Sequence, residues 1–123
     1  MKSEAELLEI LANFTGTEQY HRFSALFRNV LLTDGAKALA DECQAYWLID
    51  VIASHIPKVR DTFCVVTLKR RGGGATITLA DDTPSTKTYA RQRITYTDFP
   101  LQEIKLYLIR QDGDWVIELP SEY

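Results

Sequence analysis

The 123-residue chain is poor in the residues that build metal and disulfide sites, with only two cysteines and two histidines. Cys43 and Cys64 lack the Cys-x-x-Cys spacing of a zinc or redox motif, so we expect two buried, reduced thiols. Neither His21 nor His55 belongs to a motif such as His-Glu-x-x-His. The sequence therefore predicts no metal and no cofactor.

Long apolar runs are also missing. None reaches the roughly 18 residues that span a bilayer, and the opening residues Met1-Lys2-Ser3-Glu4 lack the apolar stretch of a signal peptide. We therefore predict a soluble cytoplasmic protein without membrane contact. The hydrophobic share of 46% and the charged share of 25% are typical of folded globular chains. The length suits a single domain over residues 1–123.

An excess of positive charge is absent too. Lysine and arginine number 14 against 17 aspartates and glutamates, for a formal net charge of -3. Because dominant binding to a phosphate backbone usually requires a strongly basic protein, nucleic acid is a secondary hypothesis that needs a local basic patch.

Two helices are predicted in the first half of the chain. Ser3 and Glu6 have the spacing of a capping box, in which each side chain bonds an amide of the first turn. A longer helix is predicted over 36–56, with Asp34 as its N-terminal cap. A break near residues 43–44 into two helices is the alternative.

Residues 17–33 fit neither the helical nor the strand period over a useful length. The alternation of polar and aromatic residues in 18–23 favours a short strand, which could pair with a second strand at 29–33 as a hairpin. A helix across 19–29 is the alternative.

After Pro57 the pattern changes to period two and β-branched residues increase. Hairpin connections are expected at the glycine-rich residues 70–74, at the loop 81–86 and at Asp112-Gly113. The predicted fold is α+β, with N-terminal helices packed on one face of a C-terminal antiparallel meander sheet of about five strands. The strands are expected at 62–69, 75–80, 87–96, 103–110 and 114–119.

The basic residues of the sheet half form the main candidate surface. Arg91 and Arg93 share one strand face, and strict alternation puts Tyr89 on the same side. Such basic and aromatic surfaces can bind single strands, whereas the alternative is a solvated outer face whose charges discourage aggregation. The candidate contacts for nucleic acid or a protein partner are Arg70, Arg71, Lys87, Tyr89, Arg91 and Arg93.

Catalytic chemistry has little support in the sequence. A small hydrolase would have to use His21 or a pair of carboxylates at a defined separation, which the sequence does not reveal. Cys43 lies on the apolar side of a predicted helix, so an unreactive thiol is expected. We assign no catalytic residue.

Five segments carry a resemblance to a known family. They are residues 14–18 (FTGTE), 32–37 (LTDGAK), 45–50 (AYWLID), 97–101 (TDFPL) and 119–123 (LPSEY). On these segments the chain resembles a family of small uncharacterised bacterial proteins, also carried by plasmids and phages and classed as a domain of unknown function. The resemblance implies an association with mobile elements, and it implies no activity.

Three functional hypotheses follow. The first is a non-catalytic protein-interaction module, including a mobile-element inhibitor of a host defence protein. The second is a nucleic-acid-binding protein that uses the basic outer sheet face, and the third is a small hydrolase. A homodimer through exposed edge strands is a further option.

Overall fold

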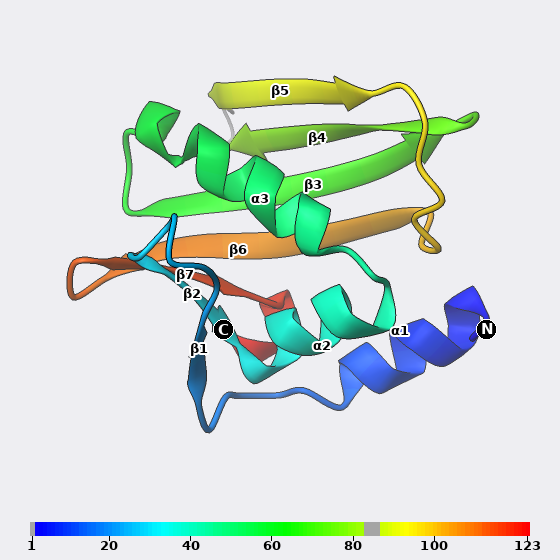
Figure 1. Ribbon diagram of the computed structural model, residues 1–123, viewed down its shortest axis with the longest axis horizontal. Coiled ribbons are helices and arrows are strands. Elements are labelled where there is room, and N and C mark those ends of the chain that lie inside the picture. Colours follow the sequence, from blue (N-terminus) through cyan, green and yellow to red (C-terminus); the bar gives the residue numbers. More distant parts are fainter. Residues whose placement is uncertain (1, 83–86) are drawn as a thin grey trace.

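The computed structural model describes residues 2–82 and 87–123, and in this part seven strands form one mixed sheet. The strand order is β1-β2-β7-β6-β3-β4-β5, and Figure 1 shows the helices lying across it. No helix in this part is long and apolar enough to cross a membrane. The strands are β1 (Tyr20–Arg22), β2 (Val30–Thr33), β3 (Phe63–Arg71), β4 (Gly74–Ala80), β5 (Thr88–Ile94), β6 (Glu103–Gln111) and β7 (Asp114–Glu118).

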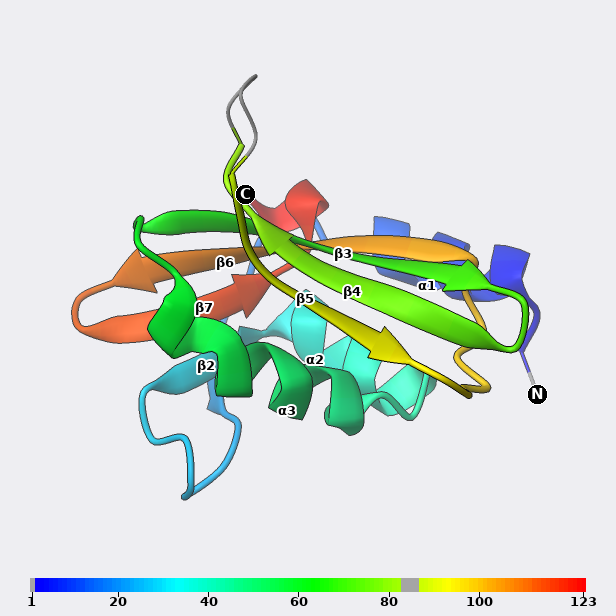
Figure 2. The same ribbon diagram turned by 90° about the horizontal axis from the view of Figure 1, so that it is seen from above.

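The helices give the sheet two different faces. The α-helices are α1 (Glu4–Ala12), α2 (Asp34–Glu42) and α3 (Tyr46–His55), and the short 3-10 turns are η1 (Ile56–Lys58) and η2 (Pro120–Glu122). Seen from above, α2 and α3 lie on one side of the sheet and η2 lies on the other (Figure 2). We call the side under α2 and α3 the covered face and the opposite side the open face.

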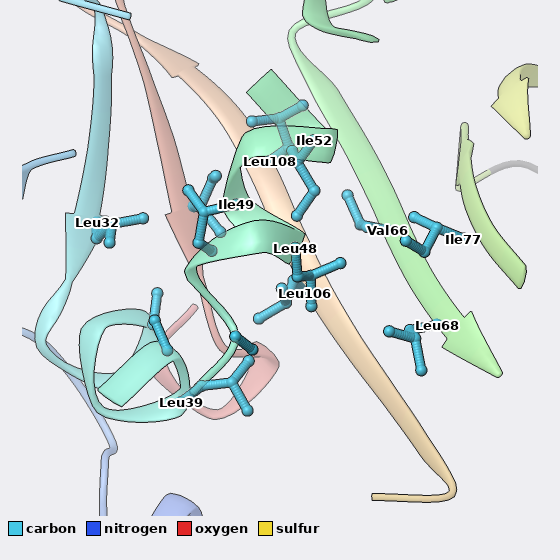
Figure 3. Packing of buried hydrophobic residues seen from close by; sticks show 14 of the residues in the cluster. Leu32, Leu39, Leu48, Ile49, Ile52, Val66, Leu68, Ile77, Leu106 and Leu108 are labelled. Atoms are coloured by element: carbon cyan, nitrogen blue, oxygen red, sulfur yellow. The ribbon is translucent and has the colours of Figure 1, made fainter. Parts of the chain in front are cut away.

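The covered face holds the hydrophobic core. Val66 and Leu68 of β3 are at most 2% exposed, and they belong to one buried cluster with Leu48 and Ile52 of α3 (Figure 3). Burying each aliphatic side chain of this size contributes about 1.5–3 kcal/mol. The core therefore explains why α3 lies flat on the sheet.

Both cysteines are free and buried, as predicted. Burial raises the pKa of the Cys43 thiol to about 11 and that of Cys64 to about 12. Because the thiolate is the reactive form, both side chains act as core residues near neutral pH.

Helices α1 and α2 start at hydroxyl caps, whereas the N-cap residue of α3, Ala45, makes no side-chain hydrogen bond. The capping box is confirmed, since the Glu6 amide donates to Ser3 Oγ and the Ser3 amide donates to Glu6 Oε1. The cap of α2 is Thr33, whose Oγ1 accepts from the Ala36 amide at 3.2 Å. The prediction of Asp34 as the cap is wrong, because Asp34 is already the first helical residue. Its carboxylate forms hydrogen bonds with Glu18 and His21, outside the helix.

A single helix over 36–56 is also wrong, and the alternative break is confirmed. Helices α2 and α3 are separated at residues 43–45, where Gln44 has a left-handed φ of 50°. The break redirects the chain so that Trp47 packs edge-on against Phe99, with ring centroids 6.2 Å apart.

The predicted N-terminal hairpin is confirmed, and the alternative helix across 19–29 is wrong. Strand β2 also pairs in parallel with β7, with Val30 opposite Trp115. The C-terminal half has five antiparallel strands, as predicted, but they are not a meander, because β6 pairs with β3 and not with β5. With β1 and β2 added, the described sheet has seven strands and is mixed. A pairing between residues so far apart leaves no local pattern in the sequence.

The C-terminal hairpins are confirmed with tighter turns than expected. Strand β3 continues to Arg71, and Gly72 takes a φ of 60° in the turn to β4. Asp112 and Gly113 turn β6 into β7 with φ values of 51° and 86°, which glycine tolerates best. Strands β4 and β5 pair antiparallel, and part of their predicted loop, 83–86, lies outside the described residues.

Candidate functional site

Alternate residues of β3, β4, β5 and β6 point to the open face. The pairing register places them in rows across the strands, which lie about 4.8 Å apart, and successive rows lie roughly 7 Å apart. The first row is Arg91, Thr78, Thr67 and Lys105, and the second is Arg93, Thr76, Lys69 and Glu103. Each row thus has an arginine from β5 at its outer end and a threonine from β4 beside it, and β3 contributes Thr67 to the first row and Lys69 to the second.

All residues of these rows except Lys105 and Glu103, which belong to β6, line a hollow of about 540 Å³ on the open face. Threonine and alanine side chains, including Thr67, Thr76 and Thr78, contribute to its surface. Among the described residues that line it, none is acidic, and the basic ones are Lys69, Arg70, Arg71, Arg91 and Arg93. The hollow therefore concentrates positive charge over hydroxyl groups that can donate hydrogen bonds.

Most of this charge is uncompensated within the described part of the chain. Lys69 Nζ lies 3.7 Å from Glu103 Oε1, and both side chains are exposed. No described carboxylate forms an ion pair with Arg71, Arg91 or Arg93. Guanidinium groups that are free in this way present donors suited to bidentate contact with phosphate or carboxylate.

Arg70 borders the hollow, but alternation along β3 directs its side chain to the covered face. Its Nη1 donates to the carbonyl oxygen of Phe99 at 2.8 Å, and its Nη2 donates to that of Thr97 at 3.3 Å. Its Nε is buried without a partner in the described structure. The guanidinium therefore holds the segment before β6 in place, and its charge does not serve the hollow.

Tyr89 and Lys87 also do not lie where simple alternation along β5 would place their side chains. A β-bulge shifts the register between β4 and β5, so that Leu79 pairs with Ala90 and Ala80 pairs with Thr88. The bulge leaves Tyr89 out of the pairing, and its ring packs against the core. Lys87 is exposed before β5, where its backbone bonds Asp81. Of the six candidate contacts, Arg71, Arg91 and Arg93 present their charge to the hollow.

An aromatic cluster on the open face was not predicted. Phe63, Tyr107 and Tyr123 have ring centroids 4.9, 5.5 and 5.4 Å apart. Alternation places Phe63 and Tyr107 on the same face as Lys69 and Lys105. Tyr123 reaches them only because η2 brings the end of the chain onto this face, and no sequence period reveals that.

The turn η2 is held by a C-terminal latch, defined here as Glu122 with Thr33 and Gly35. Glu122 Oε1 accepts from Thr33 Oγ1 at 2.6 Å and from the Leu119 amide at 2.9 Å. Its Oε2 accepts from the Gly35 amide at 2.9 Å. The carboxylate thus satisfies a free amide at the positive end of α2. A Cβ at Gly35 would lie 2.4 Å from Oε1, so only glycine leaves room.

His21 is part of a surface hydrogen-bond network. Its Nε2 lies 2.8 Å from Asp34 Oδ1, while the Glu18 amide donates to Asp34 Oδ2 at 2.9 Å. These bonds lower the pKa of Asp34, the Glu18 amide first and then His21. Their effect is to tie β1 to the start of α2.

A second hollow, of about 440 Å³, lies beside the break between α2 and α3. It is lined by Cys43, Trp47 and Asp98, among others, and His21 lines neither this hollow nor the basic one. The described residues contain no group of three or more potential metal ligands. The structure therefore does not bring His21 and Cys43 together in either hollow.

The loop between β1 and β2, residues 23–29, exposes apolar surface. Leu26 is 82% exposed. Phe23 stacks on Phe27 and on Tyr46 of α3, with ring centroids 6.2 and 6.5 Å apart. The 23–29 loop is thus an apolar projection on the opposite side of the molecule from η2 (Figure 2).

Comparison with known proteins gives a family without an assigned activity. A model of a family of unknown function, DUF6876, matches residues 5–123. A crystal structure of a protein of unknown function from Enterococcus faecalis is similar at 15% sequence identity and a TM-score of 0.46, covering 85% of this chain and 98% of that one. No curated protein matches the chain.

Proposed function

The chain belongs to the DUF6876 family of unknown function, and we propose that it is a binding module that holds the phosphate backbone of a nucleic acid on the open face of its sheet. The observation that carries this proposal is the hollow of about 540 Å³, whose described lining contains basic residues and no acidic one. Phosphate contacts supply most of the affinity of sequence-independent nucleic-acid binding.

The arrangement of the cations supports a chain-like ligand. Arg91 and Arg93 occupy successive rows, roughly 7 Å apart along β5. Arg71 lies at the end of β3, close to the turn into β4. A single small anion would need these groups to converge on one point, whereas a polyanion can contact them in sequence.

The charge distribution also explains why the net charge of the chain does not predict whether one surface can bind phosphate. The first turn of α1 is acidic, with Glu4 and Glu6, and α2 ends in Asp41 and Glu42. These carboxylates belong to the helices and not to the lining of the basic hollow. A formal charge of -3 is therefore compatible with a surface that attracts phosphate.

The test is a charge reversal at the hollow. The double variant Arg91→Glu/Arg93→Glu should weaken binding of a fluorescent oligonucleotide, measured by anisotropy, on the order of tenfold or more. Losing two phosphate contacts should also reduce the slope of log Kd against log salt by about 1.4, because each contact contributes about 0.7 for single strands.

The matched control is Lys58→Glu/Arg60→Glu, which makes the same change in net charge at exposed positions after α3. We expect this variant to keep most of the affinity. Equal losses in both variants would mean that only the overall charge matters, and unchanged binding in the hollow variant would remove the proposal.

A second candidate is binding of a protein partner through the 23–29 loop, and the 82% exposure of Leu26 favours it. This candidate includes the inhibition of a host protein by a mobile-element product. Wild-type protein should then retain a stoichiometric partner from a bacterial lysate, and Leu26→Asp should not. Recovery of the same partner by both proteins would exclude the loop as the contact.

A further inference from the structure

The aromatic cluster of Phe63, Tyr107 and Tyr123 is positioned to meet a ligand. The three rings pack edge-on or tilted, at interplanar angles of 67° and 88° for the two contacts of Tyr123. Tyr123 is 76% exposed, and Phe63 and Tyr107 are partly buried. The residue before Tyr123 is Glu122, which Thr33 and Gly35 hold in place through the latch. The outermost ring is therefore held by contacts on one side and accessible to solvent on the other.

The aromatic cluster and the basic hollow lie on one continuous face. Phe63 begins β3 and Arg71 ends it, which places them about 26 Å apart along one strand. Between them the open face carries the shorter side chains of Val65 and Thr67 and then Lys69, next to Arg71. A ligand that lies along β3 therefore meets cations at one end and aromatic rings at the other.

The charges at the aromatic end suit bases better than phosphates. Glu118 lies opposite Tyr107 in the register of β6 and β7, and Glu122 precedes Tyr123. Carboxylates repel phosphate groups, but they do not repel an uncharged base that stacks on a ring. Stacking on aromatic side chains is how proteins commonly hold unpaired bases, and it works with every base.

We infer that the aromatic cluster is a stacking platform for unpaired bases, so that the ligand of the open face is single-stranded nucleic acid. This inference rests on the proposed function, because the basic hollow supplies the phosphate contacts. In a duplex the faces of the bases are already stacked on one another and are not available to Tyr123. The aromatic cluster thus adds a preference for single-stranded over duplex nucleic acid, which the cations alone do not give.

The experiment compares three ligands of equal length by fluorescence anisotropy: oligo(dT) of about 12 nucleotides, an abasic oligomer with the same backbone, and a DNA duplex. Wild-type protein should bind oligo(dT) at least roughly fivefold more tightly than the abasic oligomer, and more tightly than the duplex. Tyr123→Ala should weaken oligo(dT) binding by roughly 5- to 150-fold. Binding of the abasic oligomer should not change, and Tyr123→Phe should bind oligo(dT) as wild type does.

The control variant is Tyr20→Ala, which removes a ring that is 50% exposed on β1, the edge of the sheet opposite β5. It should leave all three affinities unchanged. Equal binding of oligo(dT) and the abasic oligomer by wild-type protein would overturn the inference without the need for any variant. If that binding still depended on Arg91 and Arg93, the proposed function would survive. Absence of salt-dependent binding to every oligomer would instead remove the proposed function itself.

Discussion

The two faces of the sheet are built from the same strands and differ in almost every physical property. On β3, Val66 and Leu68 are buried under α3, while their neighbours Thr67 and Lys69 face solvent or the basic hollow. The covered face is where burial of apolar surface stabilises the fold. The open face has little apolar surface to bury at its basic end, so its residues are free to serve binding.

The comparison also shows how a small acidic protein can have a basic site. Period-two alternation separates side chains by face, and α2, which lies on the covered face (Figure 2), ends in the carboxylates Asp41 and Glu42. Net charge averages over both faces and hides this separation. The face of the sheet, and not the whole chain, is the unit on which charge should be counted.

The largest loss of stability is expected on the covered face of β3, next to a position on the open face where little loss is expected. Leu68→Ala removes a fully buried side chain and should lower the free energy of unfolding by about 2–5 kcal/mol. Thr67→Val, one residue away on the open face, keeps the branched shape and should change it by less than about 0.5 kcal/mol. Urea denaturation of both variants measures the difference. Similar losses for the two would mean that the faces do not differ in packing as described.

A second prediction concerns the latch, which connects the open face to a helix of the covered face. Gly35→Ala places a methyl group 2.4 Å from Glu122 Oε1 and should cost about 1–3 kcal/mol of stability. Gly16→Ala is the matched control, because a Cβ there meets nothing within 4 Å. Thermal unfolding followed by circular dichroism compares the two. A tolerated alanine at position 35 would show that Glu122 can leave the end of α2 without cost.

The smallest effect comes from Glu118, the one carboxylate buried on the open face among the described residues. Burial first, and then the charge of Glu122, raise the pKa of Glu118. A raised pKa means that the folded state favours the protonated form. Its stabilising contribution is therefore present below the pKa of the unfolded state and is lost as the pH rises through the folded-state pKa.

Glu118→Gln should consequently raise the Tm at pH 7, and the gain should disappear below about pH 4, where both states of the wild type are protonated. Glu9→Gln, at an exposed position of α1, should leave the Tm unchanged at both pH values. A Tm that falls at pH 7 in Glu118→Gln would show that the charged form makes a favourable contact.

The confirmed predictions concern local features, such as caps and turns, that depend on residues close together in the sequence. Ser3 and Glu6 lie three residues apart, so their capping box forms within one helical turn. Asp112 and Gly113 form a hairpin turn for the same reason. The basic face was also predictable, because alternation alone puts Arg91 and Arg93 together. Tyr89 was misplaced because a bulge interrupts that alternation, and nothing in the local sequence marks it.

Long-range contacts account for the rest of the candidate site. Ser121 Oγ donates to the carbonyl oxygen of Phe14 at 2.7 Å, and Glu122 bonds Thr33 and Gly35. Three of the segments that carry the family resemblance, 14–18, 32–37 and 119–123, therefore meet around η2. These segments are therefore joined by contacts that hold the fold together.

Near neighbours along the chain are enough to set the local geometry of this protein: which side chains share a strand face, where several turns and caps form, and that the thiols are core residues. These features depend on steric and hydrogen-bonding preferences that act over a few residues. Three features depend on the folded arrangement: β2 pairs with β7, the Arg70 guanidinium turns away from the basic hollow, and Tyr123 joins Phe63 and Tyr107. Each of these requires distant segments to be brought together by burial of a common core, and that information is distributed over the whole chain.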